Sequence, residues 1–311
     1  MRIIAISSLV VLLASCIKVG PASDVTVEKS PQRLTRGEYL VESVMGCVDC
    51  HSVRDFSYYA GPVIPETKGA GGELFDESIG FPGSVYSPNI TPFALESWTD
   101  GEIIRAITAG VSKDGSPLFP IMPYHAFADM SEEDLFAVVA YLRTLAPVEA
   151  IHPEGKLNFP LNLLVRTMPQ EKPRPKFTPK RGTAEYNKYI TKMALCNDCH
   201  TPRGSKGEYI TEMYMAGGDP MTIAGGVKVA PANLTPHETG LANWSKDQFI
   251  ARFKAFDNDS TKYIPLAEGQ PNTVMPWLYY ATMSEDDLGA IFDYLQSLPA
   301  IEHQVVKYQT D

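Results

Sequence analysis

Four of the five cysteines in this 311-residue chain lie in two copies of one pattern that ends in histidine. The two copies are Cys47-x-x-Cys50-His51 and Cys196-x-x-Cys199-His200. A Cys-x-x-Cys pair can form a redox disulfide, supply half of a zinc site or, with a histidine next to it, attach haem covalently. Background composition would produce such a pentapeptide in roughly one chain in a thousand. Two copies therefore indicate one shared chemistry.

Haem attachment accounts for all three side chains of each copy. Neighbouring residues on a helical turn point about 100° apart, so Cys50 and His51 do not converge on one small ion, although they can hold a porphyrin from two directions. Zinc would need further ligands, and neither copy offers a second cysteine pair. A thiol–disulfide enzyme would not need the histidine twice. The sequence therefore predicts two covalent haem c groups on Cys47, Cys50, Cys196 and Cys199, with His51 and His200 as iron ligands.

A sixth iron ligand is predicted in each copy from a Met-Pro pair. Met122 follows His51 by 71 residues, and Met275 follows His200 by 75. The proline favours an extended backbone at the methionine, which suits a side chain that projects from a loop. Core packing is the alternative for either methionine alone. His125 lies one turn from Met122, but the second copy has leucine at that place.

Other side chains near the motifs could serve the haem edge. Trp98 and Trp244 could donate an indole N–H to a propionate or only pack, and Arg54 and Arg203 could pair with propionates. Asn89 and Asn233 could act at the haem edge or form turns. His152, His237 and His303 have no matching partners and are expected at the surface.

The elements that would hold these residues also come in two copies. Ser87–Pro92 is echoed by Pro231–Pro236, Trp98 by Trp244, and Ser131–Leu135 by Ser284–Leu288. Capping patterns before apolar stripes predict helices that start at Thr99, Ser131, Ser245 and Ser284. Pro147 and Pro299 are expected to stop the last helix of each copy. The glycine-rich stretches 69–83 and 217–226 are predicted loops with a short hairpin.

These signals divide the chain into two domains, 36–148 and 184–300, followed by a tail at 301–311. Each domain is a few helices and long loops, with little core unless something apolar fills its middle. A linker, 149–183, is rich in proline and basic residues. Its apolar run, Phe159–Leu164, is expected to pack along the first domain.

The fifth cysteine, Cys16, follows a short basic start and an apolar run. Residues 1–15 are predicted to be an export signal of the lipoprotein type, which leaves Cys16 lipidated and 16–35 as a tether. Cleavage by an ordinary signal peptidase is the alternative. The expected location is the periplasmic side of a bacterial membrane, with a lipid anchor. The chain's net charge of −10 makes nucleic acid an unexpected partner and favours partners with basic docking patches.

Together the motifs resemble tandem class I-type cytochrome c domains of bacterial dihaem cytochromes c, from about Arg36 to Ala300. The first half is also similar to domains in cytochrome subunits of membrane-bound alcohol and gluconate dehydrogenases, which carry three haem motifs where this chain has two. The resemblance implies an all-α fold, two haem c groups with His/Met ligation, and electron transfer.

The expected function is thus electron transfer rather than catalysis. The partners would be a dehydrogenase, a quinol-oxidising complex or a terminal acceptor. One alternative is a cytochrome subunit of a membrane-bound dehydrogenase complex. Another is a dihaem peroxidase, which needs an open iron position. The methionines at matching places in both copies argue against it.

Overall fold

The computed structural model describes residues 17–309 except 206, 224–226 and 268. The predicted signal and Cys16 lie outside these residues. None of the helices in the described part of the chain has the length and hydropathy of a membrane span. The fold is mostly helical, with 37% of residues in helices and two small sheets, as predicted.

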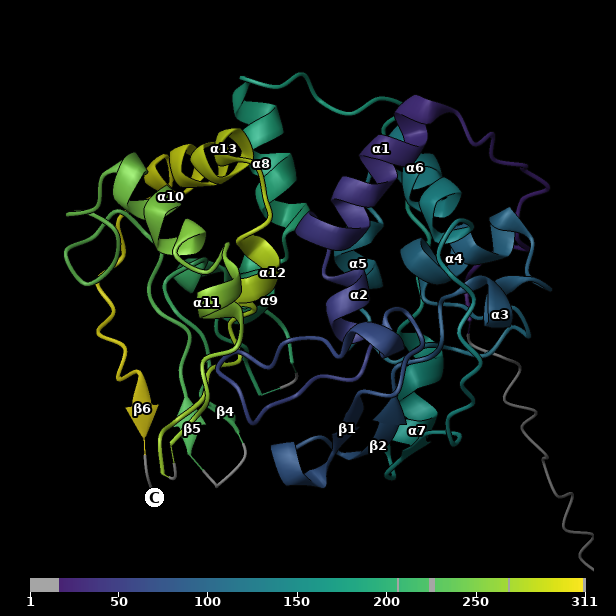
Figure 1. The fold of residues 1–311 in the computed structure, drawn as a ribbon, viewed down its shortest axis with the longest axis horizontal. Helices are drawn as coiled ribbons and strands as arrows, with labels where there is room; N and C mark the ends of the chain where they lie inside the picture. Colours follow the sequence, from purple (N-terminus) through teal and green to yellow (C-terminus); the bar gives the residue numbers. More distant parts are fainter. Residues whose placement is uncertain (1–16, 206, 224–226, 268, 310–311) are drawn as a thin grey trace, which may run out of the picture.

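The two halves share a common order of elements, to which the first half adds a π-helix and α3 and the second half adds α11 (Figure 1). The first half contains α1 (Pro31–Tyr39), the π-helix Leu40–Val44, α2 (Cys47–Cys50), β1 (Leu74–Asp76), β2 (Gly83–Tyr86), α3 (Pro92–Leu95), α4 (Asp100–Ala109), α5 (Tyr124–Phe127) and α6 (Glu132–Leu142). The linker contains β3 (Lys156–Leu157) and α7 (Leu161–Leu164). The second half contains α8 (Ala184–Met193), α9 (Cys196–His200), β4 (Met221–Thr222), β5 (Lys228–Val229), α10 (Lys246–Lys254), α11 (Asp259–Lys262), α12 (Trp277–Tyr280), α13 (Glu285–Gln296) and β6 (Tyr308–Gln309). Short 3-10 turns lie at Pro65–Thr67, Glu77–Ile79, Val165–Thr167 and Thr211–Met213.

The predicted helix starts are confirmed. Complete capping boxes open α4 at Thr99 and α10 at Ser245. The side chains of Ser131 and Ser284 accept backbone N–H groups at the starts of α6 and α13. These two helices end at Leu142 and Gln296, before the prolines that were expected to stop them.

Each predicted hairpin gains a third strand. β1 pairs with β2 and β4 with β5, both antiparallel. β3 then adds to β2, and β6 adds to β5, from the segments that follow the last helix of each half. Strands of two residues carry no hydrophobic period, so the sequence could not predict them.

The linker contacts the first half through its flanks rather than its apolar run. β3 pairs with β2, and Val165 is buried. Phe159, Leu163 and Leu164 remain 79%, 54% and 49% exposed, which differs from the expectation that this run packs. Within α7 only Leu161 is half-buried, and the buried Val165 lies in the 3-10 turn that follows.

A π-helix compensates for one extra residue in the first half. Tyr39 precedes Cys47 by 8 positions, whereas Tyr189 precedes Cys196 by 7. The bond from the Met45 N–H to the Leu40 carbonyl, 2.8 Å, closes the wider turn. Tyr39 and Tyr189 therefore reach equivalent places despite the insertion.

The two halves share one apolar core and exchange buried polar contacts. In the first half, Arg36 donates to both carboxylate oxygens of Asp134 at 2.8 and 2.9 Å, and Tyr189 of the second half donates to it at 2.8 Å. In the second half, Tyr39 of the first half and Tyr186 donate to Asp287 at 2.6 and 2.8 Å. Each buried aspartate thus joins both halves.

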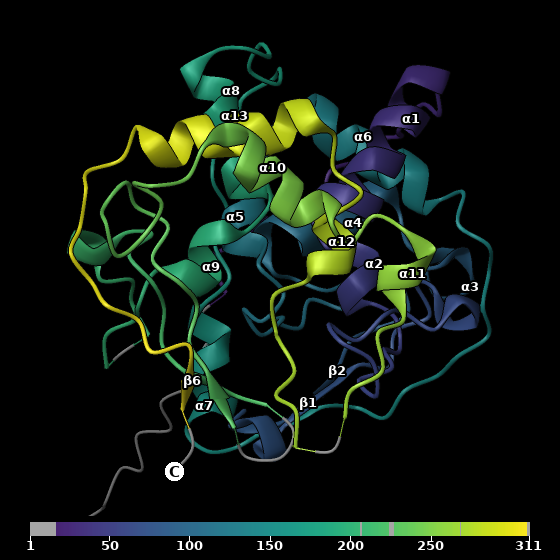
Figure 2. The same cartoon turned by 60° about the vertical axis from the view of Figure 1, so that its left-hand side comes forward.

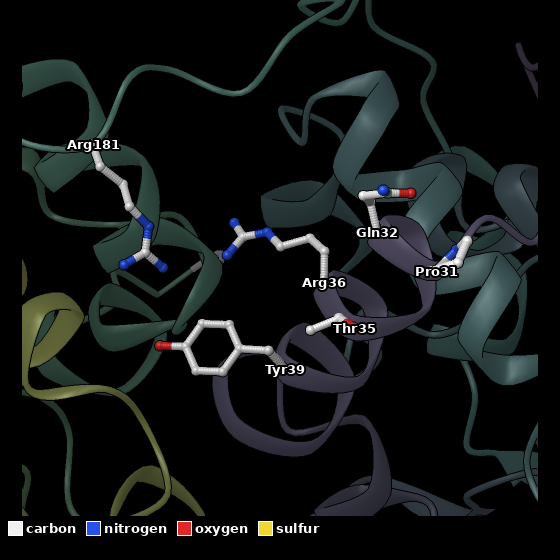
Figure 3. A pocket seen from close by; sticks show the side chains of 6 residues that line it. All are labelled: Pro31, Gln32, Thr35, Arg36, Tyr39 and Arg181. Carbon is white, nitrogen blue, oxygen red and sulfur yellow. The ribbon is translucent and has the colours of Figure 1, made fainter.

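A groove of about 490 Å³ marks the outside of this contact. Figure 3 shows Arg36 and Arg181 directed toward each other beside Tyr39. Both arginines are paired, Arg36 with Asp134 and Arg181 with Asp287 at 2.9 Å. The groove is therefore the outer rim of the inter-half contact, and its charges are already neutralised.

We expect the contribution of this contact to the free energy of unfolding to decrease at alkaline pH. Burial, then the charge of Asp287, raises the pKa of Tyr39 from 10.0 to about 12. The folded chain therefore holds this proton more tightly than the unfolded chain. Its contribution is complete below pH 10 and declines as pH rises toward 12. The free energy of unfolding, measured with urea at each pH, should fall less steeply with rising pH for Tyr39→Phe than for wild type. An equal pH dependence in the two proteins would contradict the prediction.

Candidate functional site

Each predicted iron-ligand histidine is held in the same way. His51 follows α2 and His200 ends α9, and both are buried. The Nδ1 atom of His51 lies 2.7 Å from the carbonyl oxygen of Pro88, and that of His200 lies 2.7 Å from the carbonyl oxygen of Ala232. When Nδ1 donates to a carbonyl, the lone pair of Nε2 is free to bind a metal.

Burial also favours the neutral form of these side chains. Desolvation lowers the pKa of His51 and of His200, so that both imidazoles are neutral at physiological pH. Burial raises the pKa of Cys47 and of Cys196 to about 12, and the four described cysteines are free thiols. Thiol–disulfide enzymes depend on a lowered cysteine pKa. These motifs therefore do not have the electrostatics of a redox disulfide.

The glycine-rich loops lie against the motifs. The Gly71 N–H donates to the carbonyl of His51 at 2.9 Å, and the Gly217 N–H donates to that of His200 at 3.0 Å. Gly71 has φ +76°, and a Cβ there would lie 2.4 Å from the carbonyl oxygen of Ser87. This close approach requires glycine.

Asn89 and Asn233 form turns, which is one of the two roles expected for them. The Oδ1 atom of each accepts the backbone N–H of the threonine two residues later, at 2.9 Å. Their Nδ2 atoms donate to the carbonyls of Val148 and Ile301, just beyond the last helix of each half. The turns thus fix the backbone next to the carbonyls that orient the histidines.

The structure corrects the expectation that His152 and His303 have no matching partners. His152 Nε2 lies 2.7 Å from the carbonyl oxygen of Ala70, and His303 Nδ1 lies 2.7 Å from that of Ala216. The two histidines hold equivalent glycine-rich loops. Their spacing from the last helix differs and opposite ring nitrogens are used, so the repeat was missed.

The two Met-Pro segments share one local structure. Both methionines are half-buried against the core. The residues after Pro123 and Pro276 begin α5 and α12, with N–H bonds back to the carbonyls of Met122 and Met275 at 2.7 and 2.8 Å. The competing side chain, His125, has its Nδ1 atom 2.8 Å from Gln170. Ligation by the methionines stays a prediction.

The arginines proposed for propionates have protein partners. The Nη1 atom of Arg54 lies 3.2 Å from Asp49, and its Nε atom donates to the carbonyl of Gly61 at 2.9 Å. Arg203 is exposed, and its Nη2 atom donates to the Tyr209 hydroxyl at 2.8 Å. A propionate contact for either arginine stays a prediction.

The aromatic candidates differ between the halves. Trp98 packs against the core, whereas Trp244 is 39% exposed. Tyr124, two residues after Met122, is fully buried, and its hydroxyl has no hydrogen-bond partner in the described part of the chain. A buried phenol without a partner is an available donor for a polar group of a cofactor.

The sequence did not predict the role of the tyrosine pair of α12, which contacts the residues just before both motifs. The Tyr280 hydroxyl donates to the carbonyl of Ala194 at 2.5 Å, just before the second motif. The Tyr279 hydroxyl accepts the N–H of Gly46, just before the first. Burial, then nearby cysteines, raises the pKa of both tyrosines. The first half has alanine and phenylalanine at the equivalent places, so no repeat pointed to the pair.

Removing one hydroxyl tests the link made by α12. Tyr280→Phe should lower the free energy of unfolding by about 1 kcal/mol, because the Ala194 carbonyl loses its partner. The matched control is Tyr263→Phe, at a tyrosine that is 43% exposed, with an expected loss below about 0.5 kcal/mol. Chemical denaturation of the purified variants gives both values. Equal losses would contradict the link.

The described part of segment 256–272, which contains α11, contacts the first half. The Tyr59 N–H donates to the carbonyl of Ile264 at 2.8 Å, and the Leu266 N–H donates to that of Ser57 at 3.0 Å. Tyr58 meets the ring of Tyr263 edge to face. This segment is therefore an additional connection between the halves.

No protein-family model matches the chain. It is 30% identical to the cytochrome c subunit of a quinone alcohol dehydrogenase from Gluconacetobacter polyoxogenes, over 94% of this chain and 61% of that protein. It is 26% identical to the fructose dehydrogenase cytochrome subunit of Gluconobacter japonicus, over 95% of this chain and 59% of that protein. It is 25% identical to a dihaem c-type cytochrome of Cereibacter sphaeroides, over 83% of each.

The chain thus spans about three fifths of the dehydrogenase subunits and most of the dihaem protein. The matches extend over most of its length rather than over the pentapeptides alone. The chain is therefore homologous to cytochrome c subunits of membrane-bound dehydrogenases and to a dihaem c-type cytochrome.

Proposed function

We propose that the chain carries two haem c groups and transfers electrons between redox proteins. The observation that carries this proposal is the repeated histidine geometry. In both halves, a buried imidazole next to a Cys-x-x-Cys pair has its Nδ1 atom at a backbone carbonyl, 2.7 Å away. Homology to cytochrome subunits supports the same cofactor.

The residues present fit haem c. Cys47 and Cys50 would hold one haem as thioethers and Cys196 and Cys199 the other, with His51 and His200 on the iron. Bound haem supplies reversible one-electron exchange at iron. Pro88 and Ala232 orient the imidazoles, and the glycine-rich loops cover the motif backbones. Tyr124 could donate its free hydroxyl to a propionate of the first haem.

Met122 and Met275 are the proposed sixth ligands. Their shared turn and half-burial support equivalent roles in the two halves. A thioether ligand raises the potential relative to a second imidazole, and two filled iron positions leave none for a substrate. This arrangement supports electron transfer over peroxidase activity.

Two cytochrome c domains, 36–148 and 184–300, are proposed as the units that hold the haems, on the periplasmic side of a bacterial membrane. A lipid on Cys16 would anchor them. Since relatives are named as subunits of alcohol and fructose dehydrogenases, the proposed electron donor is a dehydrogenase. The chain could serve as a subunit of such a complex.

The direct test is intact-mass analysis of chain matured in a bacterial periplasm, followed by a redox titration of its spectrum. We expect two covalent haem increments and two one-electron, six-coordinate low-spin centres. One increment or none would overturn the proposal. Two haems with a stable five-coordinate high-spin iron and peroxide turnover would instead support the peroxidase alternative.

A further inference from the structure

The tyrosine pair of α12 reaches the chain before both predicted haem-attachment motifs from one short helix. Neighbouring residues of a helix point about 100° apart, so Tyr279 and Tyr280 can contact different halves. The Tyr279 hydroxyl accepts the N–H of Gly46 in the first half, and the Tyr280 hydroxyl donates to the carbonyl of Ala194 in the second. The two rings meet edge to face, with centroids 5.2 Å apart. Figure 2 shows α12 between α2 and α9, the helices of the two motifs.

Both tyrosines bind the same peptide group of the internal repeat. The residue before the first cysteine of each motif is Gly46 in the first half and Leu195 in the second. Tyr279 binds the N–H of the peptide group that enters Gly46, and Tyr280 binds the carbonyl oxygen of the peptide group that enters Leu195. Because a peptide group is planar, a bond at either edge restricts the orientation of the whole group. The two tyrosines thus orient the chain at equivalent points, immediately before each motif helix.

The peptide groups held by the tyrosines lead into left-handed residues. Gly46 has φ +68° and Leu195 has φ +56°, and each is the N-cap of its motif helix. A left-handed backbone is disfavoured for leucine and persists where the surrounding structure holds it. The Leu195 N–H donates to the Lys192 carbonyl at 2.9 Å, and Tyr280 holds the other edge of the same peptide group. The direction in which the second motif helix starts therefore depends on Tyr280.

The same helix also follows directly on the proposed sixth ligand of the second haem. The Trp277 N–H donates to the Met275 carbonyl at 2.8 Å, and the Tyr280 N–H donates to the Pro276 carbonyl at 3.1 Å. The Met-Pro turn and the tyrosines are therefore one hydrogen-bonded structure. Tyr279 is only 6% exposed, so its contact with the first half lies in the interior. One helical turn thus joins the entry to the first motif, the entry to the second motif and the second Met-Pro segment.

We propose that Tyr279 and Tyr280 are positioning residues that fix the two haem groups relative to each other and thereby set the rate of electron exchange between them. The inference rests on the proposed function, since it takes both motifs as haem sites. Proximity and orientation govern the rate of a step between two bound groups, so a shift of either motif helix changes that rate. Because each tyrosine holds one end of a single link, loss of either hydroxyl should have the full effect of losing both.

The test compares Tyr279→Phe, Tyr280→Phe and the double variant in the full-length chain loaded with haem. In half-reduced protein, the NMR line widths of the haem methyl groups, extrapolated to zero protein concentration, give the rate of electron exchange within one molecule. In fully oxidised protein, pulsed electron paramagnetic resonance gives the dipolar coupling between the two irons. We expect each single variant to slow the exchange by at least about threefold and to broaden the range of iron–iron distances. The double variant should match the more affected single variant.

Tyr39→Phe is the matched control. It also removes a tyrosine hydroxyl that joins the halves, but at Asp287 rather than at a peptide group before a motif. It should leave the exchange rate and the iron–iron distances unchanged. Phenylalanine keeps the ring of each tyrosine, so the variants are expected to fold, and intact-mass analysis shows that they carry both haems. Either single variant of α12 decides the outcome if the other does not load both haems.

The possible outcomes separate this inference from the proposed function. Two loaded haems with a wild-type exchange rate and wild-type iron–iron distances in the α12 variants would overturn the inference and leave the proposed function intact. Equal slowing in Tyr39→Phe, or additive effects in the double variant, would assign the tyrosines to general packing of the halves and would also overturn it. Fewer than two haems in the wild-type chain would overturn the proposed function, and this inference with it.

Discussion

Met122→His is expected to lower the reduction potential of one haem and to leave the other unchanged. A second imidazole stabilises Fe(III) relative to a thioether, and axial ligands together set haem potentials over a range of about 0.8 V. The titration of the variant should therefore separate into two waves, one shifted well below its wild-type position. The sulfur-to-iron absorption band should fall to half its intensity. Met275→His should give the same result at the other haem.

The chain offers a matched control for this experiment. Met168 also precedes a proline and is half-buried, yet it lies in the linker and has no counterpart in the internal repeat. Met168→His should leave both waves and the absorption band unchanged. If Met122→His leaves the redox titration unshifted and the absorption band at full intensity, Met122 is not an iron ligand.

Asp287→Ala is expected to lower the free energy of unfolding by about 3–5 kcal/mol. Removal of one partner of a buried polar pair leaves the other groups without compensation. Here, the hydroxyls of Tyr39 and Tyr186 and the guanidinium of Arg181 would all lose their acceptor. Since Tyr39 comes from the other half, the contact between the halves should weaken as well. Denaturant unfolding followed by the haem absorption and by far-ultraviolet circular dichroism measures both effects.

A control on the same helix shows how much of the stability loss comes from the burial of the carboxylate rather than from its charge alone. Asp293 pairs with Lys246 at 2.7 Å, but both side chains are 45% exposed. Asp293→Ala should therefore cost about 1 kcal/mol or less. If the two alanine variants lose similar stability, the buried aspartate does not hold the halves together. Asp287→Asn should fall between them, because the amide oxygen still accepts one hydrogen bond.

The parts of the site that were predictable from the sequence are those encoded locally. A histidine next to a Cys-x-x-Cys pair is recognisable within five residues, and the capping serines and threonines lie within three residues of the groups they bind. The internal repeat added the methionines, because the same Met-Pro pair occurs at matching places. Each of these signals depends on short-range spacing.

Other parts of the site depend on backbone atoms or on the tertiary fold. The carbonyls of Pro88 and Ala232, which lie at the histidines, belong to peptide groups that any residue could supply. The tyrosines of α12 have no counterpart in the first half, so the internal repeat could not predict them. The local sequence predicts Asp134 and Asp287 as ordinary exposed acidic residues in a first helical turn, whereas the fold buries them.

The sequence by itself determined the chemistry of this protein: two motifs of the haem-attachment type, their spacing, and the helices that carry them. Those features are local, because a capped helix or a five-residue motif forms from neighbouring residues. The tertiary structure alone decided how the two copies meet. It selected the buried aspartates and their tyrosine partners, and it left the leucines of α7 exposed. The burial of a side chain depends on distant segments that pack against it, and a linear pattern does not contain that information.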